Sequence, residues 1–316
     1  MITKSTINML KGKSILALSL LVMFFASCDQ SDDPEPIQDD PDDEVVVIAD
    51  SELMEILMEE LNVNNPSNLT VGRMKQLETL NISNSVVTSL NGLEAAENLK
   101  VILARSVEVE DLTPISSLSE LEELDMRDAL LPTSLSFLSP LENLRSIDFQ
   151  NTAVADISAL SGKNTLTHIN LRETDVTDIS PLEGMTQLMF LNLNRAGGGN
   201  GISNPEITIP MENLYYLSLR NTTVGDDLFA EIMANKTQLV ETNVRNTGIT
   251  SVAPLVQVFE AGAFTQGLSD QYNNKISLDL QNNAITDLCL ISPWVDNFPE
   301  GELEWSAVAG DFSECD

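Results

Sequence analysis

The side chains that could carry out catalysis are few in this sequence. His168 is the single histidine among 316 residues, so a Ser-His-Asp or Cys-His arrangement would have to be built around it. Of the three cysteines, Cys28 lies near the N-terminus, and Cys289 and Cys315 lie near the C-terminus. The sequence contains no phosphate-binding glycine motif, EF-hand or metalloprotease motif. We therefore expect a protein that is not an enzyme and that needs no cofactor or metal ion.

Side chains suited to recognition are instead spaced regularly. The recurring arginines are Arg105, Arg127, Arg172, Arg195, Arg220 and Arg245. A second series pairs a ring with a small polar side chain two residues later: His168 with Asn170, Phe190 with Asn192, and Tyr216 with Ser218. Arginine can bind a carboxylate through two hydrogen bonds, and aromatic residues beside arginine are typical of protein-binding hot spots. These residue types predict the recognition of a partner.

A repeated apolar pattern must position these side chains. Counted from Leu77, the apolar residues of the first copy are Leu80, Ile82, Val87, Leu90 and Leu93. Further copies begin at Leu99, Leu121, Leu144, Leu166 and Leu188, at spacings of 22, 22, 23, 22 and 22 residues, then at Leu214 and Leu239 and near Leu278. The alternation around Leu80 predicts a short strand, and the later apolar residues predict a tight 3₁₀-like turn on the opposite side. Stacked turns of this kind share one continuous core.

The repeated pattern resembles the L-x-x-L-x-L-x-x-N-x-I motif of leucine-rich repeats. The N position holds Ser85, Thr152, Thr174, Thr222, Thr247 and Asn283, whose side chains can bond to the backbone. The period of 22 residues and the phrases Asp-Ile-Ser-Ala-Leu (156–160) and Asp-Ile-Ser-Pro-Leu (178–182) are similar to the internalin subclass of bacterial repeats. The resemblance covers residues 45–291. It implies an α/β solenoid, a right-handed horseshoe of about nine repeats with a helical N-terminal cap and a C-terminal cap, and it identifies no ligand.

The expected segments follow from this resemblance and from changes in composition. They are a leader (1–27), a tether (28–44), the helical N-terminal cap (45–76), the leucine-rich repeats (77–291) and the C-terminal cap (292–316). In the N-terminal cap, an amphipathic helix is predicted from Ser51 to Leu61, with Asp50 or Ser51 as its N-cap.

Three departures interrupt the repeats. Gly197–Gly201 predicts a flexible loop, Asp226–Lys236 predicts a longer helix on the convex side, and an insertion of about 14 residues falls within Val256–Lys275. At the C-terminal end, Cys289 and Cys315 either form a disulfide worth about 3 kcal/mol or remain unpaired thiols.

The N-terminus has the features of a secretory signal. Three lysines precede the apolar run Ile15–Phe25, which is too short to span a bilayer comfortably. The ending Phe25-Ala26-Ser27-Cys28 resembles the lipobox of bacterial lipoproteins, which implies a diacylated Cys28; ordinary secretion is the alternative. Residues 29–44 hold nine acids and three prolines, which predicts an extended tether.

The acidic tract after Cys28 also resembles the surface-export signals of some Gram-negative lipoproteins. It implies a lipid-anchored protein of the bacterial outer membrane, displayed on the cell surface; a plain spacer and a periplasm-facing body are the alternatives. Membrane contact is expected through the lipid anchor alone.

The charge balance excludes one class of partner. The chain has 49 acidic and 16 basic residues, a net charge of −33, which disfavours nucleic-acid binding. In the predicted register, positions +2, +4, +6 and +7 of each repeat face the concave side. Six of the 13 bases that follow Cys28 lie there, so the concave side is expected to be nearly neutral on an acidic body.

We therefore predict a monomeric, lipid-anchored binding module that recognises a protein or an acidic glycan on its concave face around repeats five to seven. A structural alternative remains, in which the arginines pair with Asp125, Asp148 or Glu173 and the aromatic residues shield the sheet. Two other functions are a scaffolding subunit that uses the convex side and inserted loops, and a glycan-handling accessory. The small number of exposed aromatic residues disfavours the last.

Overall fold

The computed structural model describes residues 40–129, 131–265, 276–298 and 302–304, with Phe312 and Cys315. Residues 40–316 form one compact unit. The predicted leader, Cys28 and the tether up to residue 39 lie outside the described residues, as do residues 266–275 of the predicted insertion.

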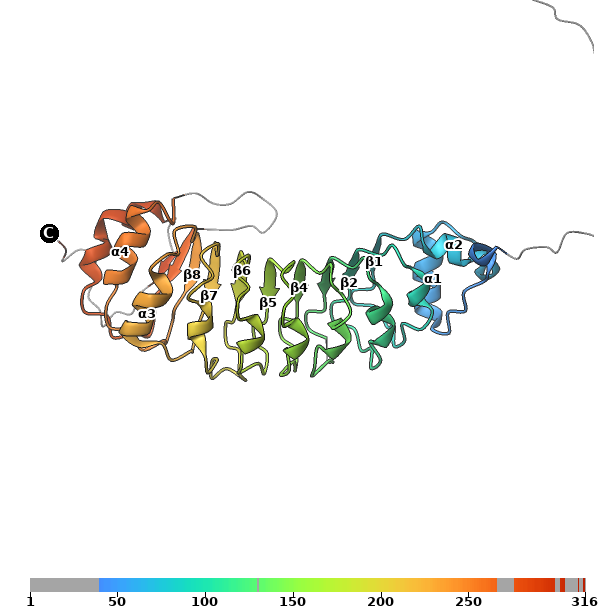
Figure 1. Ribbon diagram of the computed structural model, residues 1–316, viewed down its shortest axis with the longest axis horizontal. Helices are drawn as coiled ribbons and strands as arrows, with labels where there is room; N and C mark the ends of the chain where they lie inside the picture. Colours follow the sequence, from blue (N-terminus) through green and yellow to red (C-terminus); the bar gives the residue numbers. More distant parts are fainter. Residues whose placement is uncertain are drawn as a thin grey trace, which may run out of the picture. The chain divides into compact units, whose positions relative to one another are not determined.

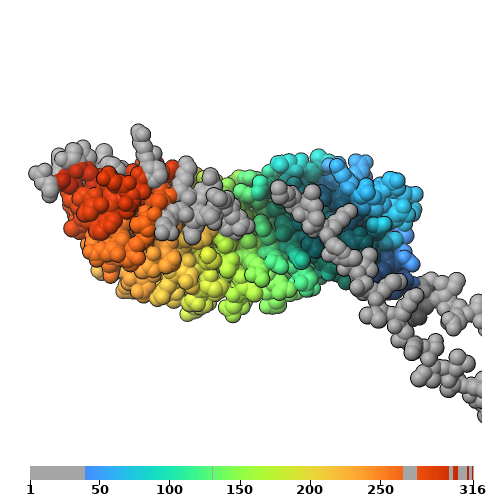
Figure 2. Space-filling model, turned by 90° about the horizontal axis from the view of Figure 1, so that it is seen from above, coloured from blue at the N-terminus to red at the C-terminus, as the bar shows by residue number. Residues whose placement is uncertain are grey.

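A parallel sheet of ten strands, ordered as in the chain, forms one side of the repeats (Figure 1). The strands are β1 (Thr79–Asn81), β2 (Val101–Leu103), β3 (Glu123–Asp125), β4 (Ser146–Asp148), β5 (His168–Asn170), β6 (Phe190–Asn192), β7 (Tyr216–Ser218), β8 (Glu241–Asn243), β9 (Ser277–Asp279) and β10 (Leu303–Glu304). The order confirms the predicted solenoid, in which each turn contacts its neighbours. The successive colour bands of the surface follow the same order (Figure 2).

Each three-residue strand buries its middle side chain. Leu80, Ile102 and Leu124 are fully buried, and the register places them side by side. The first and third residues of each strand point to the other side, because successive side chains of a strand alternate. We call this outward side, with the residues that follow each strand, the strand face; it corresponds to the face predicted to be concave.

A tight turn follows every strand from β1 to β9. The residue at position +7 of each repeat has a left-handed backbone, with φ between 55° and 68°, and five of the nine are Asn, which tolerates this conformation. The predicted N-position side chains close the turn from within: the Thr152 hydroxyl donates to Phe149 O and the Thr174 hydroxyl to Leu171 O, both at 2.7 Å. These bonds confirm the predicted role of the buried Thr residues.

Short helices cover the side opposite the sheet. The 3₁₀ helices are η3 (Leu93–Ala95), η4 (Thr113–Ser117), η5 (Ser136–Leu138), η6 (Ser158–Leu160), η7 (Ser180–Leu182) and η8 (Pro205–Thr208). Two α-helices, α3 (Gly225–Met233) and α4 (Ala253–Glu260), take their place in the later repeats. The longer helix predicted within Asp226–Lys236 is thereby confirmed. One hydrophobic core runs between the sheet and these helices.

Helices also precede the first repeat. They are η1 (Pro41–Asp43), α1 (Ser51–Glu60), η2 (Pro66–Asn68) and α2 (Val71–Met74). Asp50 is the N-cap of α1, where its Oδ1 accepts hydrogen bonds from the backbone of Glu52 and Leu53. Its Oδ2 accepts from the backbone N–H groups of Thr88 and Ser89 in the first repeat. One carboxylate thus starts α1 and ties it to the repeats.

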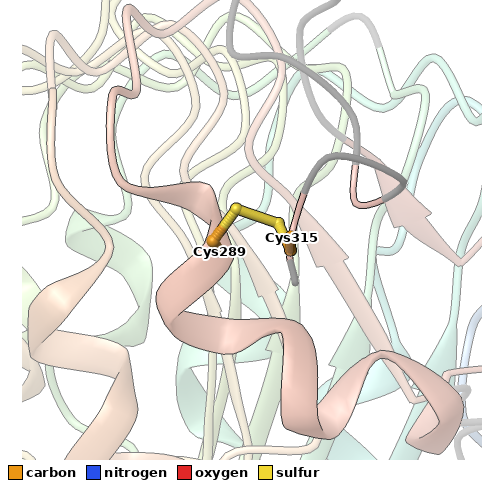
Figure 3. The surroundings of a disulfide bond; sticks show 2 residues. All are labelled: Cys289 and Cys315. Carbon is orange, nitrogen blue, oxygen red and sulfur yellow. A yellow bond between two sulfur atoms is a disulfide. The ribbon is translucent and has the colours of Figure 1, made fainter.

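The C-terminal end combines a 3₁₀ helix, a strand and a disulfide. Helix η9 (Leu288–Asn297) follows the ninth repeat, and β10 pairs with β9 within the segment predicted as a cap. Cys289 in η9 is bonded to Cys315, with a Cα–Cα distance of 5.3 Å (Figure 3). The described residues contain no helix that is both long and apolar enough to cross a membrane.

Candidate functional site

The strand face brings the predicted recognition residues together over β5, β6 and β7. The register aligns His168 with Phe190 and Phe190 with Tyr216. The rings form one stack, which we call the aromatic ladder: the centroids of His168 and Phe190 are 6.1 Å apart and those of Phe190 and Tyr216 are 4.3 Å apart, with interplanar angles of 21° in both pairs. All three side chains are half-buried. The ladder is therefore an ordered apolar strip that still reaches the surface.

Tyr215 supports the aromatic ladder from below, and the sequence did not single it out. Its hydroxyl lies 3.0 Å from Nε2 of His168, and its ring centroid lies 5.9 Å from His168 and 6.1 Å from Phe190. On the other side of the imidazole, Nδ1 lies 2.8 Å from the Thr167 hydroxyl. Burial lowers the pKa of His168, so this imidazole is neutral at pH 7. The sequence feature that could have identified Tyr215 is the pair of adjacent tyrosines, in which Tyr215 directly precedes β7.

Arg105 and Arg127 are tied to the sheet by a buried carboxylate. Nε of Arg105 and Nη2 of Arg127 lie 2.7 and 2.6 Å from Oδ2 of Asp125, whose side chain is only 6% exposed. Arg127 also lies 3.3 Å from Asp148. Burial acts to raise the pKa of Asp125, but hydrogen bonds from Arg127 and Arg105 outweigh it and lower that pKa. These two arginines are engaged in a structural ion-pair network.

Arg172 and Arg195 share a single, half-buried partner. Oε1 of Glu173 lies 3.4 Å from Nη2 of Arg172 and 3.2 Å from Nη1 of Arg195. Glu173 and Arg195 occupy the left-handed position of their turns, so Arg195 lies beyond the end of β6 rather than on a strand. Such partly exposed pairs add little stability.

Arg220 and Arg245 have no carboxylate within 4.0 Å among the described residues. The predicted row of arginines is therefore divided. Its N-terminal members are held by Asp125, and its last two members have no acidic partner in the part of the chain that the structure describes.

Asn170 and Asn192 have a clear structural task. Their Oδ1 atoms accept hydrogen bonds from the backbone N–H groups two residues later, of Arg172 at 3.2 Å and of Asn194 at 3.0 Å. The same bond recurs at the third strand residue elsewhere, in Asn81, Asp125, Asp148, Asn243 and Asp279. Ser218 replaces the Asn or Asp in β7, and its buried hydroxyl has no hydrogen-bond partner among the described residues.

Two small hollows lie in the middle repeats, one of them against the aromatic ladder. One of about 80 Å³ is lined by Ser146, Ile147, Asp148, His168, Asn170 and Phe190. Another of about 180 Å³ lies beside the glycine loop and includes Glu173, Arg195 and Gly198. Pockets for small molecules are typically about 300–1,000 Å³. These dimensions favour contact with an extended surface over enclosure of a small ligand. Among the described residues, no three His, Cys, Asp or Glu side chains form a group that could hold a metal ion.

Solved structures with the same arrangement of strands include two proteins of Listeria monocytogenes. An internalin (inlF) aligns with a TM-score of 0.64 at 22% identity, covering 80% of this chain and 74% of its own. An internalin C2 aligns with a TM-score of 0.51 at 22% identity, covering 84% of this chain and 95% of its own. The fold is an internalin-like leucine-rich-repeat solenoid.

This internalin-like fold extends to other organisms. A leucine-rich-repeat protein of Leptospira interrogans aligns with a TM-score of 0.54 at 20% identity, covering 77% of this chain and 70% of its own. A plant peptide hormone receptor, solved in complex with RGF2, aligns with a TM-score of 0.53 at 13% identity and covers 36% of its own length. The sequence matches no known family profile and no curated protein. Identities this low establish the fold alone.

Proposed function

We propose that this internalin-like protein is a non-enzymatic recognition module that binds a protein partner on the strand face of β5–β8. The observation that carries the proposal is the aromatic ladder, half-buried and ordered, beside two arginines without an acidic partner among the described residues. Aromatic residues and arginine dominate binding hot spots because they bury a large area at a small cost in side-chain entropy.

Rigidity favours the same surface. The strands on both sides of Phe190 are hydrogen-bonded in register, and the third residue of β5 and of β6 is fixed to the following turn. A preorganised surface loses little conformational entropy when a partner binds. The plant receptor with this fold was solved in complex with RGF2, which supports a binding role for a solenoid of this kind.

We also propose that the protein is exported and anchored by a lipid on Cys28, with the acidic tether holding the repeats away from an outer membrane. The disulfide between Cys289 and Cys315 supports export, because such bonds persist in oxidising compartments. Surface display is part of this proposal. Added protease would degrade the repeats on intact cells if they face outward, and would spare them if they face the periplasm.

A capture experiment tests the binding function. The processed chain from Asp29 onward serves as bait for envelope proteins and, in parallel, for a glycan array. Tyr216→Ala and Arg220→Glu are expected to abolish capture; Arg220→Glu should change the melting temperature little, and Tyr216→Ala should lower it by no more than the loss of one ring of the ladder. Arg73→Glu, on exposed helix α2, makes the same charge change away from the strand face and should have no effect.

Each other outcome is informative. Capture that survives both strand-face variants contradicts the proposal, and its loss in variants of the opposite side would support the scaffolding alternative. Binding to acidic glycans and to no protein would replace the protein partner by a glycan on the same surface.

A further inference from the structure

Buried polar atoms without hydrogen-bond partners gather on one part of the strand face. Among the described residues these atoms are Nε of Arg172, Oδ1 of Asn194, Oγ of Ser218 and Nε of Arg220. Arg172, Asn194 and Arg220 occupy the same position, +6, in three consecutive repeats. Their turns are neighbours, because Glu173 N donates to Asn194 O and Leu193 N donates to Ser218 O. We refer to these four atoms, which lie on three consecutive repeats over β5–β7, as the cluster.

The same position is satisfied in two earlier repeats. In the earlier repeats, Asp125 at the third residue of β3 accepts hydrogen bonds from Nε of Arg105 in the preceding repeat and from Nε of Arg127 in its own. In β5, β6 and β7 the third residue is Asn, Asn and Ser, so the sheet supplies no carboxylate there. Buried unpaired donors cost stability, and each calls for an explanation.

Three arginines and two glutamates lie around the cluster. Arg172, Arg195 and Arg220 are on the same three repeats, Glu173 is the one acidic side chain that pairs with any of them among the described residues, and Glu241 lies beside Tyr216 on the next strand. Burial raises the pKa of Tyr216, the negative charge of Glu241 adds to this, and the positive charge of Arg172 opposes both, which places the guanidinium of Arg172 near the ladder. The side-chain amide of Asn194 makes no hydrogen bond among the described residues. Rotating this amide by 180°, so that its NH₂ group is presented, therefore breaks no hydrogen bond.

We infer that Arg172 and Arg220 form a subsite for a carboxylate of the partner, which takes the place that Asp125 has beside Arg105 and Arg127. The two Nε–H groups donate to the carboxylate, and the hydroxyl of Ser218 and the turned amide of Asn194 add donors. This inference rests on the proposed function, because it assigns a chemical class to the ligand of that same face. The carboxylate belongs to an acidic side chain or to a chain terminus of the partner protein.

Nuclear magnetic resonance of the arginine Nε–H groups in the processed chain tests the subsite directly. The probes are N-acetyl-aspartic acid amide, which carries a side-chain carboxylate, N-acetyl-alanine, which carries a terminal one, and N-acetyl-asparagine amide, which carries none. We expect saturable shifts of the Arg172 and Arg220 signals with one or both acids, in the millimolar range, and none with the neutral amide. Arg105 and Arg127 should not respond, because Asp125 already occupies them. The more effective acid identifies the source of the carboxylate.

Two variants make the test more specific. Arg220→Lys keeps the charge but removes the planar fork, and should weaken binding of the acid about tenfold. Asn192→Asp is nearly isosteric, retains the acceptor for Asn194 N, and places an internal carboxylate one strand from Arg172. This variant should raise the melting temperature and should also weaken the binding of the acid about tenfold. If either variant binds the acid as tightly as the natural protein, the subsite is contradicted.

The outcomes separate this inference from the proposed function. Equal shifts at Arg105 and Arg220, or shifts with the neutral amide, would overturn the subsite even if partner capture by the strand face persists. Saturable binding of the acids, combined with capture that Tyr216→Ala and Arg220→Glu leave intact, would retain the subsite and overturn the proposed function.

Discussion

Between β3 and β7 the third residue of the strand changes from Asp125 to Ser218, and the state of the neighbouring arginines changes with it. Over β2–β4, Arg127 and its neighbour Arg105 are held by a buried carboxylate. Over β7 and β8, Arg220 and Arg245 have no acidic partner among the described residues. Arg105 and Arg127 are therefore structural because Asp125 holds both of them, whereas Arg220, beside Ser218, is available.

The largest expected effect concerns the strand face over β2–β4, which we call the closed half; the strand face over β5–β8 is the open half. Asp125→Ala leaves Arg105 and Arg127 without their shared partner and should lower the free energy of unfolding by about 3 kcal/mol, as is typical when one member of a buried ion pair is removed. Denaturant unfolding followed by circular dichroism measures this. Asp175→Ala, at an exposed position, should change stability by less than about 0.5 kcal/mol. Equal effects in the two variants would show that the network is not structural.

The next effect concerns the aromatic ladder of the open half. Phe190→Ala removes the central ring and should cost about 1.5 kcal/mol, because the side chain is half-buried and stacks on a ring at each side. Val101→Ala removes the matching first residue of β2 and should cost less than about 1 kcal/mol. The same unfolding measurement compares them. Partner capture should be lost only in the first variant; loss in both would remove the distinction between the halves.

The two halves should also respond to acid in different ranges. Burial lowers the folded-state pKa of His168, so the unfolded chain binds a proton first as pH falls below about 6.5, and the stability that the neutral imidazole contributes is lost as pH falls through the folded-state pKa. Asp125 also has a lowered pKa, but as a carboxylate it loses its contribution only below about pH 4. Melting curves of the natural protein and of His168→Gln between pH 7 and 5 test this, since the variant should lack the first loss. Identical curves would contradict it.

The smallest expected effect is on the stability of the open half. Arg220→Glu should change the free energy of unfolding by less than about 0.5 kcal/mol, because no ion pair of the described residues is broken. Arg127→Glu introduces a carboxylate beside Asp125 and should destabilise the protein by several times as much. Thermal unfolding of the two variants side by side provides the comparison. Similar losses would mean that Arg220 is also structural.

The sequence was sufficient for the fold because its physics is local and repeated. Each repeat carries its own buried strand residue, such as Leu80 or Ile102, and its own turn-closing side chain, such as Thr152. Strand order and register then follow from stacking, and the alignment of the aromatic ladder follows from the register. The strands begin one residue earlier than the Leu80–Ile82 alternation alone suggests.

The hydrogen-bond and ion-pair partners of individual polar side chains could not be predicted in this way. The pairing of Arg105 with Asp125 depends on side-chain orientation across two repeats, and the sequence left pairing and ligand binding as alternatives. Asn192 has an amide suited to ligands, but its oxygen is used by the following turn. Arg195 was assigned to the face by spacing, whereas the left-handed turn places it beyond the strand.

Lys236, on the side opposite the sheet, is a further residue whose contacts the repeat pattern does not predict. A lysine is expected at the surface, but this one is fully buried and its Nζ donates to the carbonyls of Thr208 and Ile209 at 3.0 and 2.9 Å. Burial lowers its pKa to about 8. It caps the end of η8, a task that depends on the geometry of the preceding repeat and not on the apolar pattern.

Site-specific photocrosslinking in the cells that make the protein can show directly which surface binds the partner. A photoreactive phenylalanine replaces Phe190 in the open half, Val101 at the matching position of β2, or Glu183 on the exposed opposite side. We expect a crosslinked partner protein from position 190 and none from positions 101 and 183. A partner crosslinked from position 183 and not from position 190 would contradict the proposed function, because the strand face of β5–β8 would then not be the binding surface.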